Sequence, residues 1–93
     1  MERSVEGISW RTDRLWTLFS ESVAALPAAV SVISGDQEVS RRELSGRTEA
    51  AAAFFSDRGI AAWDRVLVEG HATLDTIVTA LALSKLGAVF CPF

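Results

Sequence analysis

The side chains with the widest chemical repertoire are a single histidine, His71, and a single cysteine, Cys91. Their separation matches no common metal-ligand spacing. Glu69 and Asp75 stand near the histidine, but no serine completes a nucleophile–base–acid set with them. His71 falls where a strand is predicted to give way to a helix, a place where α/β sheets gather ligands. His71 could line a pocket or lie in a solvent-facing loop, and the loop position is the favoured interpretation. The apolar neighbours of Cys91 favour a small packed group over a nucleophile.

Phosphate and nucleic-acid chemistry has little support in the residue pattern. The phosphate-binding patterns GxxxxGK[ST] and GxGxxG are absent. Arg41 and Arg42 could hold a phosphate at a helix N-terminus, but solvated first-turn side chains are the favoured interpretation. The tryptophans Trp10, Trp16 and Trp63 favour packing over base stacking, because no basic groove accompanies them. We therefore predict no catalytic, cofactor-binding or metal-binding residue in this chain.

Composition narrows the function classes further. The 93 residues support one small domain, 1–93. Residues 1–11 form a lead-in whose conformation the sequence does not indicate. The net charge is -3 with scattered basic residues, which argues against a nucleic-acid partner. One cysteine cannot form an internal disulfide, which favours a reducing, cytoplasmic location. Leu74–Phe93 is the most apolar stretch, but polar residues interrupt it, so we expect no membrane span. Met1–Asp13 mixes acidic and basic residues without an apolar core, so we expect no signal peptide.

Hydrophobic spacing predicts a helix and then a hairpin in the first half of the chain. Apolar residues recur at helical spacing over Leu15–Leu26, with Thr12 or Asp13 as a cap and Pro27 as a stop. Two short extended runs then flank a glycine–aspartate turn, which predicts a β-hairpin over Val30–Val39.

A second helix is predicted at about Arg41–Arg58. Ser40 and Glu43 fit a capping box, in which the serine hydroxyl accepts from the Glu43 amide and the carboxylate reaches back to the Ser40 amide. Gly59 is a suitable stop. The apolar face of this helix is predicted to consist of Leu44, Thr48, Ala51 and Phe55.

The last third of the chain predicts a strand, a helix and a strand. Arg65–Glu69 and Ala88–Cys91 are short apolar runs typical of strands buried on both faces. Between them, Leu74–Leu86 is helical in character, with Thr73 as its N-cap and Gly87 at its end. Short connections make this a βαβ unit with parallel strands and a right-handed crossover.

Several motifs in this order resemble the opening of adenylate-forming ligases. Val39–Leu44 resembles the first core motif, L-[TS]-Y-x-E-L, with Arg41 in place of the usual aromatic residue. Asp64-Arg65-Val66 resembles a G-D-R-V segment, with Trp63 where glycine is usual. Leu83–Phe93 is similar to the second core motif, L-K-A-G-x-A-Y-x-P-[LI]. The resemblance covers residues 15 to 93 and is greatest for nonribosomal peptide synthetase adenylation domains.

The resemblance implies an α/β fold, with a β-hairpin and a βαβ unit carrying a partly parallel sheet, as the N-terminal part of the ligase fold. The parent chemistry activates an amino acid or other carboxylic acid with ATP and Mg²⁺ and passes the acyl group to a thiol. In this family the phosphate loop, the adenine and ribose sites and the catalytic lysine follow the second motif. We therefore expect a truncated, non-catalytic piece with no cofactor of its own and no enzyme activity alone.

Two other interpretations stay open. The chain could be a natural stand-alone module that docks a megasynthase domain or a split-ligase partner, or an unrelated small α/β ligand-binding domain. Strands with apolar faces but few covering elements also predict a protein partner or self-association through an uncovered sheet edge.

Overall fold

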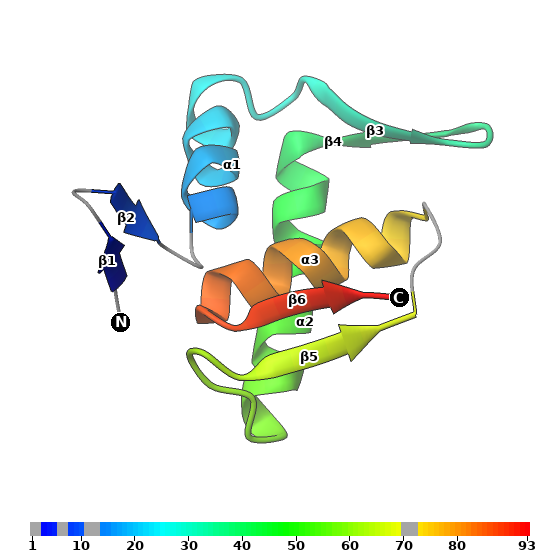
Figure 1. The fold of residues 1–93 in the computed structure, drawn as a ribbon. Helices are drawn as coiled ribbons and strands as arrows, with labels where there is room; N and C mark the ends of the chain where they lie inside the picture. The colour runs from blue at the N-terminus through cyan, green and yellow to red at the C-terminus, as the bar shows by residue number, and fades with distance from the viewer. Residues whose placement is uncertain (1–2, 6–7, 11–13, 70–72) are drawn as a thin grey trace.

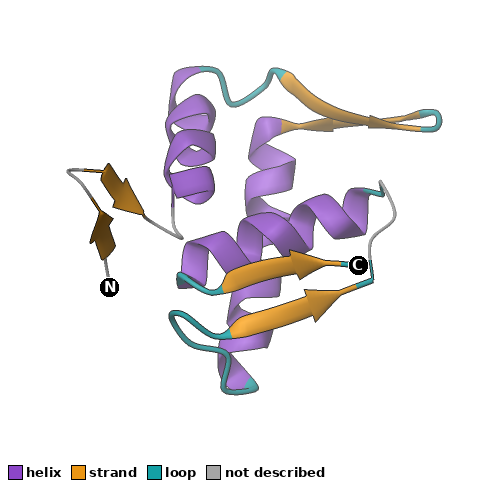
Figure 2. Ribbon diagram, in the orientation of Figure 1, coloured by secondary structure: helices purple, strands orange, loops and turns teal. Residues whose placement is uncertain are grey.

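The computed structural model describes residues 3–5, 8–10, 14–69 and 73–93. These residues form three helices and three two-stranded sheets (Figures 1 and 2). The lead-in, whose conformation the sequence left open, contains an antiparallel pair, β1 (Arg3–Val5) and β2 (Ile8–Trp10). His71 and the proposed caps Thr12 and Asp13 lie outside the described residues.

The first helix and the hairpin form as the sequence predicts. α1 spans Arg14–Ala25 and ends before Pro27, which has no amide hydrogen to continue a helix. β3 (Val30–Ser34) and β4 (Gln37–Ser40) pair in antiparallel fashion, with an irregularity in the register between Val30 and Val32. Gly35 has a φ of 60°, a left-handed conformation that glycine adopts without steric cost and that the tight turn requires.

α2 spans Arg41–Asp57, and its cap is only half of the predicted capping box. The Ser40 hydroxyl accepts from the Glu43 amide at 3.1 Å, as expected. The Glu43 carboxylate, however, accepts from the Arg47 guanidinium at 2.9 Å, so the predicted return bond to Ser40 is wrong. The physical reason is that Ser40 is also the last residue of β4, opposite Val30, and its backbone belongs to the hairpin.

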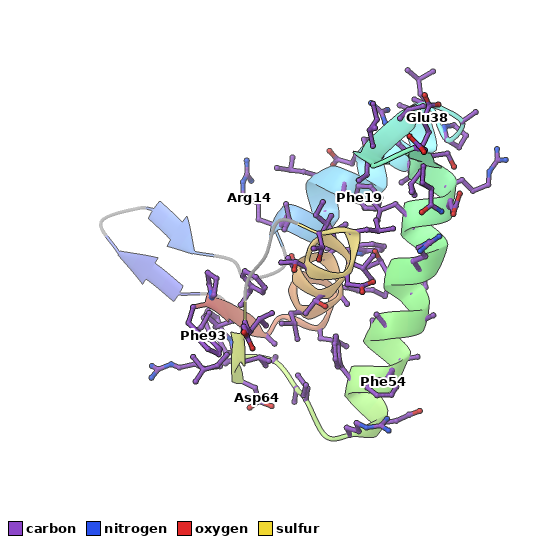
Figure 3. The ribbon with its side chains drawn as sticks, turned by 90° about the vertical axis from the view of Figure 1, so that its right-hand side faces the viewer. Arg14, Phe19, Glu38, Phe54, Asp64 and Phe93 are labelled. Carbon is purple, nitrogen blue, oxygen red and sulfur yellow. The ribbon has the colours of Figure 1, made fainter. Side chains whose placement is uncertain are left out.

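The predicted βαβ unit is confirmed. β5 (Arg65–Val68) and β6 (Val89–Pro92) are parallel, with Arg65 opposite Val89, and α3 (Leu74–Leu86) connects them. The crossover is right-handed, as Figures 1 and 3 show together. Thr73 caps α3 by accepting from the Thr76 amide at 3.3 Å, and Gly87 ends the helix at a φ of 76°.

The molecule is layered around α3. Figures 1 and 3 show α3 between α2 on one side and the β5–β6 pair on the other, with α1 alongside. The buried core lies where the hairpin, α2 and α3 meet and consists of Val39, Leu44 and Leu81. Thr48, one turn after Leu44 on α2, is also fully buried. Thr48 is satisfied there, since its hydroxyl donates to the Leu44 carbonyl at 2.8 Å. No helix in the described part of the chain is long and apolar enough to cross a membrane.

The strands of the βαβ unit are not buried on both faces, which corrects the expectation from their apolar sequence. Leu67, at the centre of β5, is 74 % exposed, and the terminal Phe93 is 73 % exposed. α3 covers one face of the pair, and no described helix covers the other (Figure 1). A two-stranded sheet with one helix has too few neighbours to enclose its apolar residues.

Candidate functional site

The residues that match the first ligase motif connect α1, the hairpin and α2 through hydrogen bonds. The Arg41 and Arg42 amides donate to the carbonyls of Ala29 and Pro27 at 2.8 and 2.9 Å. Two amides at the N-terminus of α2 are therefore already bonded, which leaves little of the anion site that such a terminus can provide.

Arg41 occupies the position at which the motif usually has an aromatic residue. Its guanidinium donates to the Ser22 carbonyl near the end of α1 at 2.9 Å, and the residue is half-buried. The interpretation of Arg41 as a solvated side chain is therefore wrong, whereas Arg42 is exposed as expected. Arg41 binds the carbonyl-rich end of one helix while it starts the next, a contact that a cation makes favourably.

The second motif has a similar structural role on α3. The Ser84 hydroxyl accepts from the Trp16 amide at 2.9 Å, and this bond joins α3 to α1. The Lys85 ammonium lies 3.4 Å from a Glu49 carboxylate oxygen and 4.8 Å from the centre of the Trp16 ring. Both lysine contacts are partly exposed and of modest energy, but together they align three helices.

The segment before β5 contains the most unusual backbone conformation among the described residues. Trp63 has a φ of 70°, and no other described non-glycine residue has a positive φ. Its amide donates to the Gly87 carbonyl at 2.8 Å, and the Asp64 carboxylate accepts from the Ala61 amide at 2.8 Å. These bonds hold the turn at the start of the strand. The tryptophan at a position where the resembling motif has glycine therefore adopts the conformation that glycine would favour.

The reactive side chains of the described residues form no group that could hold a metal ion. Cys91 is half-buried, whereas the side chains of Glu69 and Asp75 are exposed. Within residues 14–69 and 73–93, no group of three or more histidine, cysteine, aspartate or glutamate side chains is placed to hold a metal ion.

An apolar groove of about 540 Å³ lies between α1, α3 and the hairpin. Leu15 and Leu18 of α1 line it and are each 51 % exposed. A smaller pocket of about 210 Å³ shares Leu15 and Ala80 with this groove and extends it toward β6. Sequence analysis anticipated exposed apolar surface but did not locate this groove, because the groove depends on how α1 lies on α3.

Comparison with known proteins gives this arrangement a family. The AMP-binding enzyme family matches residues 19–93. Malpibaldin synthetase of Mortierella alpina is 31 % identical over 75 residues, which cover 81 % of this chain and 1 % of that protein. Gramicidin S synthase 2 of Brevibacillus brevis is likewise 31 % identical over 75 residues and is covered to 2 %.

Solved structures agree in fold. The N-terminal subdomain of NpsA from Klebsiella oxytoca superposes with a TM-score of 0.81 at 26 % identity, covering 85 % of this chain and 21 % of that one. The same subdomain in complex with anthranilyl-AMSN gives a TM-score of 0.82 at 26 % identity, with 20 % of that chain covered. The chain thus spans about a fifth of these structures and a few per cent of the curated relatives. It belongs to the AMP-binding enzyme family and is a segment of the N-terminal subdomain of a nonribosomal peptide synthetase adenylation domain.

Proposed function

We propose that this segment is a structural, non-catalytic part of a ligase that activates an amino acid or another carboxylic acid. The proposal rests on the contacts that the motif residues make within the fold. Ser40 caps α2, Arg41 binds the end of α1, and Ser84 accepts from α1. Gly87 ends α3 in a left-handed conformation, and its carbonyl accepts from the turn before β5. Each contact positions backbone, and none presents a group to a substrate.

The parent reaction makes specific demands that we place outside this segment. Forming an acyl-adenylate from a carboxylate and ATP needs donors and a cation that stabilise charge on phosphorus. We expect no ATP or Mg²⁺ site in this segment. Two observations support that expectation: the described residues contain no metal-ligand cluster of acidic, imidazole or thiol side chains, and the amides of Arg41 and Arg42 are already bonded. The segment would instead form a rigid support against which ligand-binding parts of a longer enzyme pack. The NpsA subdomain, of which this chain matches a fifth, has been solved in complex with anthranilyl-AMSN, so that subdomain as a whole holds a ligand.

The direct test is ATP–pyrophosphate exchange with the pure 93-residue chain and a panel of amino, aryl and fatty acids. We expect exchange at the level of a no-protein control, and no heat of ATP–Mg²⁺ binding in calorimetry. Reproducible exchange above that control would refute the non-catalytic role.

A second experiment tests the structural role itself. In NpsA, the matched segment is replaced by residues 19–93 of this chain, and exchange activity is compared with that of intact NpsA. We expect a folded chimera that keeps measurable activity, whereas the same chimera with Leu44→Asp loses both folding and activity, because a charge replaces a side chain that is 2 % exposed. A folded chimera with no activity would mean that residues in the segment do more than support the fold.

A further inference from the structure

Helix α1 differs from the other two helices in how it is held to the rest of the chain. No residue of α1 is buried, although the partly buried Phe19 packs against the core. Both other helices contain buried residues: Leu44, Thr48 and Ala52 on α2, and Leu81, Ala82, Leu83 and Ser84 on α3. Burial of apolar surface therefore holds α1 less firmly than it holds α2 and α3.

Hydrogen bonds from distant side chains hold α1 near both of its ends. Near its start, the Trp16 amide donates to the Ser84 hydroxyl of α3 at 2.9 Å. First-turn amides have no acceptor within their own helix, so Ser84 acts as a cap supplied by another element. Near its end, the Ser22 carbonyl accepts from the Arg41 guanidinium at 2.9 Å, where the helix dipole favours a cation. We call Ser84 and Arg41 the two clamps of α1.

Both clamps are themselves anchored in the packed part of the molecule. Ser84 is 5 % exposed on α3, and Arg41 begins α2 with its amide bonded to the Ala29 carbonyl at 2.8 Å. Every group in the two clamp contacts belongs to a residue between 16 and 84, so the contacts do not involve the terminal strand β6. Helix α1 is thus attached to an anchored core at two points, one near each end.

Release of α1 costs less than unfolding of the whole chain. The core cluster of Val39, Leu44 and Leu81 contains no residue of α1, so the hairpin, α2 and α3 keep their own packing when α1 leaves. An isolated helix of 12 residues is marginal in water, so a released α1 also loses its internal hydrogen bonds. Openings of this kind, smaller than global unfolding, are detected by amide hydrogen exchange.

We propose that α1 is a separate conformational unit, which docks on and releases from the α2–α3 core as a whole, with Ser84 and Arg41 setting its docked population. Leu15 and Leu18 of α1 line one wall of the apolar groove, and Leu81 of α3 lies among the residues of the facing wall. Helix α1 is therefore a lid whose release opens this groove. The device does not depend on the proposed structural role in a ligase.

The first experiment is hydrogen exchange of the 93-residue chain at increasing urea concentration, read by mass spectrometry. We expect the amides of α1 to exchange at least about tenfold faster than those of α2 and α3 in the absence of urea. Their exchange should also depend less on urea, because release of one helix exposes less surface than complete unfolding. Equal protection and equal urea dependence in all three helices would overturn the proposal.

The second experiment tests the two clamps. Ser84→Ala and Arg41→Met should each raise the opening of α1 about tenfold, because each leaves a helix-end group without its partner. The increase should be equal at both ends of α1, since the helix releases as a unit. Arg41→Lys keeps a charged donor and should have a smaller effect. Arg42→Met, at the exposed neighbouring position, is the matched control and should leave α1 unchanged.

A core variant separates release of α1 from unfolding of the whole chain. Gly46→Ala stabilises α2 at a position where a Cβ atom meets no other atom within 4 Å. It should slow the exchange of α2 and α3 about threefold and leave that of α1 unchanged. Slower exchange of α1 in this variant would overturn the proposal, because α1 would then open only with the rest. A clamp variant that affects only the amides at its own end would overturn it too, because the helix would then fray rather than release.

Discussion

The two sides of α3 differ sharply in how well they are enclosed. Toward α2 and the hairpin, α3 presents Leu81, which is 5 % exposed and packs in one cluster with Val39 and Leu44. On the other side, every residue of β5 and β6 is half-buried or exposed, and only Ala88, just before β6, is buried. Leu67 of β5 is exposed. Helices α2 and α3 together enclose each other's apolar stripes, whereas a parallel strand pair has two faces and two edges to cover.

The largest expected effect contrasts one leucine from each side. Leu81→Ala removes a side chain that is only 5 % exposed and leaves a cavity beside Val39 and Leu44, so it should lower the free energy of unfolding by about 2–5 kcal/mol. Leu67→Ala, at an exposed position, should change it by less than about 0.5 kcal/mol in the monomer. Urea denaturation at concentrations low enough to keep the chain monomeric measures both. Similar losses at the two sites would contradict the contrast between the enclosed and open sides.

A second test concerns the strained turn that leads into the open side. Trp63 holds a φ of 70°, which is unfavourable for any residue with a Cβ atom. Both Trp63→Ala and Trp63→Gly lose the indole, but only glycine relieves the backbone. The glycine variant should therefore be more stable than the alanine variant by about 1 kcal/mol, despite its more flexible unfolded chain. Thermal unfolding of the two variants decides the sign, and a more stable alanine variant would show that the turn relaxes when the indole is removed.

On the enclosed side, the cap of α2 offers a test of moderate size. Ser40→Ala removes the acceptor for the Glu43 amide and should destabilise the chain by about 1 kcal/mol. Ser40→Asp, which can restore the acceptor, should recover most of this loss. If alanine and aspartate behave alike in urea denaturation, the hairpin rather than the serine hydroxyl holds the start of α2.

The smallest predicted effect is a gain. Gly46 lies within α2, and a Cβ atom built there meets no atom within 4 Å. Gly46→Ala should therefore stabilise the chain by about 0.5–1 kcal/mol, because alanine loses less backbone freedom on folding and favours the helix. Gly35→Ala is the matched control, with equally open space but a φ of 60°, and should destabilise the chain. A gain at both glycines would contradict the argument that the left-handed φ of Gly35 penalises a Cβ atom.

Features that depend on near neighbours could be predicted from the sequence. The Ser40 cap, the glycine–aspartate turn and the stop at Gly87 each involve residues within a few positions of one another. The family resemblance also followed from such local motifs, because the spacing of caps, turns and strands is preserved when the fold is. The absence of a predicted catalytic residue followed from the same motifs, and exchange measurements still have to test it.

The two wrong predictions concern the side chains of Arg41 and Glu43, for which several hydrogen-bonding partners compete. Arg41 was expected in solvent, but the carbonyl of Ser22 on α1 accepts from it. Glu43 was expected to bond Ser40, but Arg47 offers a charged donor one turn away while the Ser40 backbone belongs to the hairpin. The Arg41 contact comes within reach only after α1 and α2 have packed. The Glu43–Arg47 pair is local to α2, but its advantage over the cap depends on the Ser40 backbone being bonded in the hairpin.

The amino-acid sequence alone determined which elements form, the order in which they follow, and the family whose motifs they carry. Those properties rest on hydrophobic period, capping and turn chemistry, which act over a few residues. Only the tertiary structure decided that Leu67 is exposed, that Trp63 is left-handed, and that Arg41 donates to the end of α1. Exposure and long-range hydrogen bonds depend on which neighbours each residue meets after the elements pack, and three-dimensional packing alone sets both.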